Sequence, residues 1–287
     1  MIETFDLAPQ PPLPVPAAED YARDALDASR GGWPGVAEHR DIAFGAAPWQ
    51  RFDLFVPERA RAADLLVFLH GGGWTNGYKE WCGFMAPALA ARGVALAAPT
   101  YRLAPDARYP AFLEDTLAAL AAIRARAGDF GVNPDRLFLS GHSAGGHIAA
   151  LAALRHDLWP DHGLPRRAIL GCLPVSGILD LHHPAPPSGS LEERVYLDVL
   201  DRPGDDRVAS PLNWLAQLQM PLALTWGERD TERVQRGNEA AARILETCAQ
   251  PTWTQRYPQD HFGTHLMLRD PAHPWYDTLD AMRKGTT

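Results

Sequence analysis

The stretch Gly141-His142-Ser143-Ala144-Gly145 has the pattern G-x-S-x-G, and it decides the fold that we expect for this chain. It follows the apolar run Leu137–Leu139 and precedes His147–Leu154, an alanine-rich run that predicts a helix. A serine on a sharp strand-to-helix turn exposes its hydroxyl, and the flanking glycines let neighbouring backbone come close. The pattern therefore predicts a nucleophile elbow at Ser143, although the pentapeptide alone also suits a plain glycine-rich turn.

A second motif, His70-Gly71-Gly72-Gly73-Trp74, follows the continuous apolar run Leu65–Leu69. Such a run is typical of a strand that is buried on both faces. A glycine-rich loop after this strand can turn its backbone N–H groups towards an oxyanion, with a further N–H from Ala144, the residue after the nucleophile. A phosphate-binding loop is the alternative, but the glycine spacing of neither common phosphate motif is present.

Composition narrows the class of protein. The chain has 287 residues, 46% hydrophobic and 22% charged, which suits one large α/β domain or two small ones. A net charge of −8 without a basic cluster argues against nucleic acid and against an anionic membrane surface as partners. Three widely separated cysteines without C-x-x-C spacing predict buried side chains in a reducing compartment.

The N-terminal segment differs from the rest of the chain. It has no basic region, and no run of 18 apolar residues occurs anywhere, so we expect no signal peptide, no membrane span and a cytoplasmic location. Five prolines between Pro9 and Pro16 predict an extended arm before a helix over about Ala17–Ser29. Residues 1–33 are thus expected to form an arm and helix, packed over the domain or disordered, and residues 34–287 a single domain.

Further along the chain, apolar runs alternate with helical patterns. Asp41–Phe44 and Arg51–Val56 predict a strand pair at the edge of a sheet. The alternation that follows predicts a mostly parallel sheet with helices on both faces. We expect the remaining strands at Leu65–Leu69, Val94–Ala98, Leu137–Leu139, Ala168–Pro174, Pro221–Trp226 and Trp253–Tyr257, and helices near Trp81–Arg92, Ala111–Ala127 and His147–Leu154.

The periodic pattern fails between Ser176 and Leu215, where prolines and glycines are frequent. A long insertion at the carboxyl ends of parallel strands lies where ligands bind in such sheets. We therefore expect a small cap-like insertion near residues 177–215, with a plain surface excursion as the alternative.

A serine hydroxyl needs a base to take its proton and a carboxylate to orient that base. After an elbow of this kind the chain order is serine, acid, histidine. The loop that follows the penultimate strand carries Asp230, the predicted acid, with Glu228 and Glu232 as alternatives. The loop after the last strand carries His261, the predicted base, with His265 as its competitor.

The other histidines suggest little chemistry of their own. His182 and His183 are adjacent but lack a third ligand at a suitable spacing, so we expect no metal site. His70 heads the glycine loop and is expected to hold the backbone of that loop rather than to transfer protons. Attack by an activated serine needs no cofactor, and none is expected.

Taken together, these motifs resemble the α/β-hydrolase superfamily, and within it the hormone-sensitive-lipase-like esterases. The chain also resembles the serine-dependent kynurenine formamidase (arylformamidase) branch, and the similarity extends from about Asp53 to about Leu266. The stretches that carry these resemblances are His70–Trp74, Gly141–His147, Val175–Leu181, Ser210-Pro211, Asp230-Thr231 and Asp260–Phe262.

The resemblance implies an α/β-hydrolase fold and a serine hydrolase mechanism. It implies Ser143 as the nucleophile, His261 as the base and Asp230 as the orienting acid. The oxyanion donors that it implies are the backbone N–H groups of Gly72, Gly73 and Ala144.

Two glycines depart from the formamidase pattern. That branch often has a larger residue at the position of Gly73 and a small non-glycine residue at that of Gly146. Both departures leave the backbone donors available but change the shape of the pocket, and therefore bear on the substrate.

The expected substrate is a small carboxylic ester or aryl formamide, cleaved through an acyl-enzyme. Trp74, beside the oxyanion loop, and Phe262, beside the base, are candidate substrate contacts, although both also suit the core. The alternatives are an esterase without formamidase activity and a non-catalytic ligand-binding protein on the same fold. The sequence does not indicate an oligomeric state.

Overall fold

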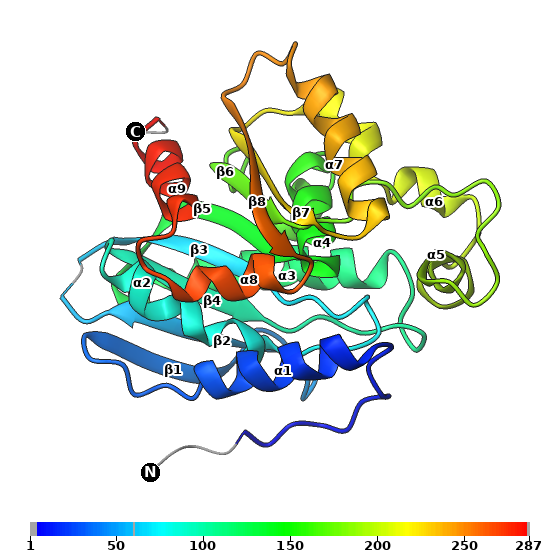
Figure 1. Ribbon diagram of the computed structural model, residues 1–287. Helices are drawn as coiled ribbons and strands as arrows, with labels where there is room; N and C mark the ends of the chain where they lie inside the picture. The colour runs from blue at the N-terminus through cyan, green and yellow to red at the C-terminus, as the bar shows by residue number, and fades with distance from the viewer. Residues whose placement is uncertain (1–4, 60, 286–287) are drawn as a thin grey trace.

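The apolar runs of the sequence assemble into one eight-stranded sheet in the computed structural model, which describes residues 5–59 and 61–285 (Figure 1). The strand order is β1-β2-β4-β3-β5-β6-β7-β8, and the pairings from β4 through β8 are all parallel. β2 runs antiparallel to both of its neighbours, β1 and β4. The strands are β1 (Val36–Ala43), β2 (Arg51–Pro57), β3 (Ala63–Leu69), β4 (Val94–Pro99), β5 (Val132–His142), β6 (Gly171–Val175), β7 (Leu222–Arg229) and β8 (Thr252–Asp260).

Helices cover both faces of this sheet, as predicted. Alternate residues of β3 point to opposite faces: Leu65 and Val67 belong to one buried cluster, and Leu66 and Phe68 to another. The first cluster packs under α3 (Ala111–Arg126), α4 (Ala144–Leu154) and α7 (Glu232–Leu245). The second packs under α1 (Pro16–Ala28), α2 (Ala86–Ala90) and α9 (Pro274–Gly285). The predicted mostly parallel sheet with helices on both faces is therefore confirmed.

Several predicted bounds were wrong. The helix expected near Trp81–Arg92 is a 3₁₀ turn, Lys79–Met85, followed by the short α2, because Gly83 and Pro87 interrupt the α-helical pattern. β1 begins at Val36 rather than Asp41, since an irregularity in register between His39 and Ile42 breaks its alternation. β6 begins at Gly171 rather than Ala168, and α9 was not anticipated.

Short helices fill the segment between β6 and β7, for which we expected a cap-like insertion. They are α5 (Leu191–Arg194), a π-helical turn over Val195–Val199, α6 (Asp205–Val208) and a 3₁₀ turn over Pro211–Gln217. In Figure 1 the α5 and α6 region projects to one side of the sheet. Within the residues that the structure describes, no helix is long and apolar enough to cross a membrane.

The N-terminal arm packs against the loop that follows β3. The Gln10 side chain makes two hydrogen bonds to Gly77, donating to the C=O at 2.8 Å and accepting from the N–H at 2.7 Å. The Asn76 side chain donates to the Pro11 C=O at 2.6 Å. Of the two outcomes considered for the arm, the described residues show the packed one, and α1 matches the predicted helix to within a residue at each end.

Candidate active site

Ser143 lies at the turn between β5, which ends at His142, and α4, which begins at Ala144. Its φ is +56° and its ψ −116°, a strained conformation for a residue with a side chain. Two backbone hydrogen bonds of 2.9 Å hold it, from the Ser143 N–H to the Val175 C=O and from the His147 N–H to the Ser143 C=O. The sharp turn expected from the G-x-S-x-G pattern is present.

The glycines of the elbow are required by close backbone approach. A Cβ at Gly141 would lie 2.4 Å from the Gly145 carbonyl oxygen. A Cβ at Gly145 would lie 2.2 Å from the Leu69 carbonyl oxygen at the end of β3. Neither distance is possible for a real Cβ, so the packing of α4 against the sheet depends on both glycines.

Ser143, His261 and Asp230 form a continuous chain of hydrogen bonds. Ser143 Oγ lies 2.8 Å from His261 Nε2, and His261 Nδ1 lies 2.7 Å from Asp230 Oδ1. A carboxylate can only accept, so Nδ1 carries the proton that it donates to Asp230 and Nε2 is left to accept the hydroxyl proton of Ser143. Ser143 is 6% exposed, which suits a hydroxyl at the bottom of a pocket.

Asp230 is held as a carboxylate by several donors. The Thr231 N–H donates to Oδ1 at 2.8 Å, while the Ser176 hydroxyl and the Gly227 N–H donate to Oδ2. Burial alone would raise the pKa of Asp230, but these bonds and the bond to His261 lower it below its ordinary value. The alternative acids Glu228 and Glu232 are exposed.

His265, the competing base, has its contacts elsewhere than at Ser143. Its side chain is fully buried, its Nδ1 accepts the Tyr21 hydroxyl at 2.8 Å, and its ring stacks on Phe68 at 4.9 Å. Burial holds the pKa of His265 well below its ordinary value. The two histidines do not share a helix face, because His261 precedes α8 (Gly263–Leu266) and only His265 lies on it.

His142 also contributes to the site, although the sequence assigned it no role. Its Nε2–H donates to the His261 carbonyl oxygen at 2.8 Å, and the two rings lie 5.0 Å apart. Burial, and then the nearby His261, lower the pKa of His142 to about 3, so this imidazole stays neutral. His142 fixes the backbone of the histidine loop. It occupies an unspecified position of the G-x-S-x-G pattern, which is why the motif carried no signal for it.

The glycine loop is held from within, as expected for His70. His70 Nδ1–H donates to the Gly71 C=O at 2.7 Å, and the Tyr101 hydroxyl donates to the His70 C=O at 2.8 Å. The Tyr101 ring stacks on the imidazole at 4.3 Å. Burial lowers the pKa of His70 to about 4, so His70 is a neutral side chain that orders the loop.

Backbone donors in this loop lie beside Ser143. Gly72 and Gly73 have φ values of +119° and +63°, which favour glycine, and both line the same cavity as Ser143. Among residues 5–59 and 61–285, neither glycine's N–H has a hydrogen-bond acceptor. Ala144 is the first residue of α4, where N–H groups have no partner within the helix.

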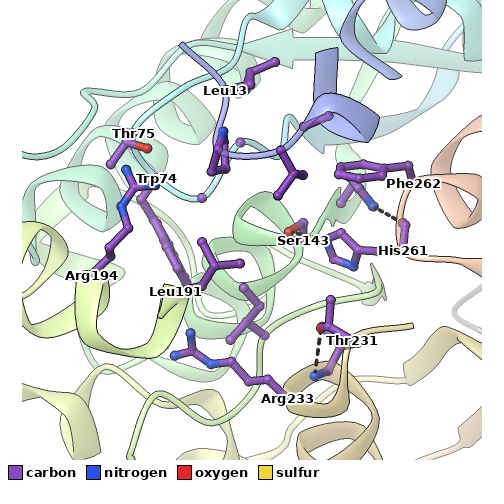
Figure 2. A pocket seen from close by; sticks show the side chains of 18 of the residues that line it. Leu13, Trp74, Thr75, Ser143, Leu191, Arg194, Thr231, Arg233, His261 and Phe262 are labelled. Carbon is purple, nitrogen blue, oxygen red and sulfur yellow. Dashed lines mark hydrogen bonds between the residues drawn. The ribbon is translucent and has the colours of Figure 1, made fainter. Parts of the chain in front are cut away.

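A cavity of about 270 Å³ opens above Ser143 and His261 (Figure 2). Parts far apart in the chain form most of its walls: the arm with α1, the glycine loop, the segment of α5, the start of α7 and the histidine loop. Leu13, Trp74, Leu191, Arg233 and Phe262 represent these parts in turn. Most of the lining is apolar, as is usual for small-molecule sites.

Trp74 and Phe262, the predicted substrate contacts, both line this cavity. Trp74 is also buried, and its indole N–H donates to His147 Nδ1 at 3.1 Å. His147 in turn donates from Nε2 to the Ala209 C=O at 2.7 Å, which joins the glycine loop to the insertion. The wall residues from α1 and α5 lie far from the motifs in the chain, and no local pattern in the sequence indicated them.

Comparisons with known proteins agree with this architecture. The BD-FAE family model matches residues 52–236, which is more than half of the chain. Solved structures of similar fold include EstE1, a thermophilic carboxylesterase from a metagenomic library, with a TM-score of 0.73 and 20% identity over 94% of this chain and 96% of that one. Esterase B from Lactobacillus Rhamnosis (HN001) has a TM-score of 0.75 and 19% identity over 94% and 93%.

Curated relatives are esterases of greater length. Esterase LipQ of Mycobacterium tuberculosis (strain ATCC 25618 / H37Rv) is 31% identical over 213 residues, which cover 68% of this chain and 49% of LipQ. The probable isoprenylcysteine alpha-carbonyl methylesterase ICMEL1 of Oryza sativa subsp. japonica is 34% identical over 120 residues, 42% of this chain and 28% of that protein. The matched region thus spans half or less of either relative. With its fold and the match over residues 52–236, the chain belongs to the BD-FAE family of α/β-hydrolase esterases.

Proposed function

We propose that this protein hydrolyses a small carboxylic ester through an acyl-enzyme, with Ser143 as nucleophile, His261 as general base and Asp230 as the acid that orients it. The observation that carries the proposal is the unbroken chain of hydrogen bonds from Ser143 Oγ through His261 to Asp230, at the bottom of an apolar cavity. The same three roles recur on unrelated folds wherever this geometry occurs.

In the first half-reaction, His261 Nε2 takes the hydroxyl proton as Ser143 Oγ bonds to the substrate carbonyl carbon. The backbone N–H groups of Gly72, Gly73 and Ala144 would hold the oxyanion of the tetrahedral intermediate. Protonated His261 then gives its proton to the leaving alcohol or amine as the bond to the leaving group breaks.

In the second half-reaction, water attacks the acyl-serine. His261 takes one proton of that water, the acyl carbon bonds to the hydroxide, and Ser143 Oγ leaves with the proton that His261 returns. A carboxylic acid is released and the enzyme regains its starting state. The lowered pKa of Asp230 supports this cycle, because an ionised carboxylate stabilises the imidazolium that forms in each half.

For the substrate, we propose a short acyl group joined to an aromatic leaving group, either an aryl ester or an aryl formamide. Aromatic side chains on the cavity wall support it, because offset or edge contacts with a planar ring add about 0.5–1.5 kcal/mol each beyond area burial. Three of these are Trp74, Trp81 and Phe262. Tyr78, another aromatic residue shortly after the glycine loop, lies outside this cavity and donates its hydroxyl to the Ala8 C=O at 2.6 Å.

The Ser143→Ala variant tests the mechanism. Removing a triad nucleophile lowers kcat by roughly 10⁶-fold in enzymes of this type, so turnover of 4-nitrophenyl acetate should fall to background while thermal unfolding stays near that of the wild type. A variant that keeps more than a small fraction of the activity would exclude Ser143 as nucleophile. A wild type without activity on any ester tested would favour the non-catalytic alternative.

A substrate panel tests the specificity. It compares kcat/KM for 4-nitrophenyl esters from acetate to decanoate with that for an N-formyl aromatic amine. We expect a maximum among the short acyl chains. A maximum at decanoate would refute the short acyl group. Activity on the acetate ester without activity on the formamide would show an esterase that lacks formamidase activity.

A further inference from the structure

Arg233 is a buried cation on the wall of the cavity that contains Ser143 and His261. It is 8% exposed and lies in the first turn of α7, shortly after the N-cap residue Thr231. Figure 2 shows its side chain running from α7 towards the residues of the α5 segment. Because the N-terminus of a helix is itself electropositive, a positive charge there is disfavoured unless an anion balances it.

The Arg233 guanidinium is poorly satisfied by its own chain. Its one hydrogen bond is a long one, from Nε to the Asp180 carbonyl oxygen at 3.4 Å. Across the described ranges 5–59 and 61–285, no carboxylate oxygen lies within 4.0 Å of an Arg233 nitrogen, and neither Nη atom has a hydrogen-bond acceptor. Burial lowers the pKa of Arg233, but the guanidinium remains charged at any pH that the protein would meet.

Other largely buried arginines in this chain, unlike Arg233, are paired with a carboxylate of the chain itself. Arg136, with an 18% exposed side chain, donates two hydrogen bonds to Asp64, and Arg155, with an 11% exposed side chain, donates three to Asp157. A buried charge is strongly unfavourable unless it is paired, so an arginine without a partner in the chain calls for a partner from outside it.

Two other charged side chains line the cavity, and neither neutralises Arg233. Glu192 comes from α5 and influences Arg233 only at longer range, without an ion pair. Arg194, from the same helix, has its Nε 3.6 Å from Asp198 Oδ2. Arg194 is thus paired with Asp198, whereas Glu192 and Asp180 act on Arg233 only at longer range. Among the described residues, the Arg233 guanidinium is left on the cavity wall without a carboxylate at ion-pair distance.

We propose that Arg233 binds a carboxylate group of the substrate, so that the preferred substrates are esters with a free carboxylate on the acyl or the leaving-group side. A planar guanidinium with both Nη atoms free matches a carboxylate in a bidentate pair. This inference rests on the proposed function for the hydrolytic centre, and it adds the substrate class. The ring of an aryl ester and the carboxylate can be accommodated together, since aromatic walls and Arg233 line one cavity.

Two matched substrate pairs test the proposal. Mono-4-nitrophenyl adipate and its terminal carboxamide differ only at the end of the acyl chain, and 4-acetoxybenzoate and 4-acetoxybenzamide differ only on the leaving group. For at least one pair, we expect wild-type kcat/KM to be about tenfold or more higher for the carboxylate, the range of a charge-assisted hydrogen bond. Equal values within both pairs would overturn the proposal.

Three single-residue variants test whether a preference for the carboxylate substrate arises from Arg233. In Arg233→Gln the carboxylate-to-carboxamide ratio should fall to about one, whereas in the control Arg236→Gln it should stay at the wild-type value. Arg236 is an exposed arginine of the same helix and lies outside the cavity. In Glu192→Gln the ratio should rise, because a competing carboxylate is gone. A preference that appears only in Glu192→Gln would show that Glu192 is the partner of Arg233, and would overturn the proposal.

A binding measurement separates this inference from the proposed function. In the Ser143→Ala background, 4-hydroxybenzoate and adipate should raise the unfolding temperature, and Arg233→Gln in the same background should abolish that shift. If Ser143→Ala still hydrolyses esters, the proposed function fails whatever Arg233 does. If wild type and Ser143→Ala behave as proposed but neither carboxylate binds or is preferred, only the role of Arg233 fails.

Discussion

Replacing Gly145 by alanine should damage both the fold and the activity, because the elbow packs backbone against backbone. The new Cβ would lie 2.2 Å from the Leu69 carbonyl oxygen and 2.3 Å from that of His70, whereas ordinary contact begins at 3.4 Å. Either α4 or the start of the glycine loop must therefore move by at least about 1 Å. Both movements shift Ser143 relative to the N–H groups of Gly72 and Gly73.

The expected magnitudes follow from that displacement. Overpacking of this kind destabilises by typically 1–3 kcal/mol, and displacing a reacting group by about 1 Å lowers the rate by about 10²-fold. Thermal unfolding followed by circular dichroism, together with kcat on 4-nitrophenyl acetate, measures both effects.

The matched control is Gly128→Ala, because a Cβ at Gly128 meets nothing within 4 Å and its φ is not positive. This variant should resemble the wild type. If Gly145→Ala keeps the unfolding temperature and kcat of Gly128→Ala, close backbone packing at Gly145 does not hold the elbow in place.

Three further predictions concern the base, the oxyanion donors and acid stability. His261→Ala should approach Ser143→Ala in its loss of kcat, and His265→Ala should keep far more activity; the reverse order would move the base to His265. Gly73→Pro removes the backbone donor and cannot adopt the positive φ of Gly73, so it should raise the activation free energy, measured through kcat, by at least about 2.7–4 kcal/mol, the scale of one lost oxyanion contact; an unchanged kcat would leave the loop a packing element. The unfolding temperature should fall as pH drops from about 6.5 towards 4, and a value that is constant between pH 7 and 5 would contradict this. The reason is that unfolding lets buried neutral histidines with folded-state pKa values of about 4, 3 and 4 take up protons, namely His70, His142 and His147.

Local sequence patterns predicted the elements whose causes are local. Leu65–Leu69 and Pro221–Trp226 are short apolar runs, each followed within two residues by glycine, and both match strands to within two residues at their starts. The elbow was equally clear, because glycine spacing and a change from strand to helix occur within a few residues. The helix α9 was missed although Trp275, Leu279 and Met282 are spaced as one helical face, so a signal was available there.

The choice of His261 over His265 was predicted from its place in the loop after the last strand, but its physical reason lies in the tertiary structure. It depends on β8 ending at Asp260, which leaves His261 in the turn and places His265 on α8. The position of His265 depends as well on Tyr21, which lies 244 residues away in the chain and whose hydroxyl is hydrogen-bonded to His265 Nδ1. The parts of the cavity wall that come from α1, α5 and α7 escaped prediction for the same reason. Arg233 on its own resembles any helical arginine, and its burial becomes visible only when α5 and α7 lie against one cavity.

Residues with strained backbone lie close to the glycine loop and the G-x-S-x-G turn. Among the described residues, five non-glycine residues have positive φ, and three of them surround the proposed catalytic centre: Trp74 at +64°, Ser143 at +56° and Ser176 at +47°. Such conformations are unfavourable by about 1–3 kcal/mol each and persist only where the surroundings impose them. These three residues follow the carboxyl ends of β3, β5 and β6, neighbouring strands of the sheet.

Each of these three residues also has a hydrogen-bond partner that fixes its side chain. The Trp74 indole donates to His147, the Ser143 hydroxyl contacts His261, and the Ser176 hydroxyl donates to Asp230. Relaxing any of the three turns would redirect a group that contacts the proposed Ser143–His261–Asp230 relay or the cavity wall. The stability lost to strain is therefore coupled to orientation. The packed sheet holds the proposed nucleophile, the proposed acid and the pocket wall in place before a substrate arrives, which is the condition for electrostatic preorganisation.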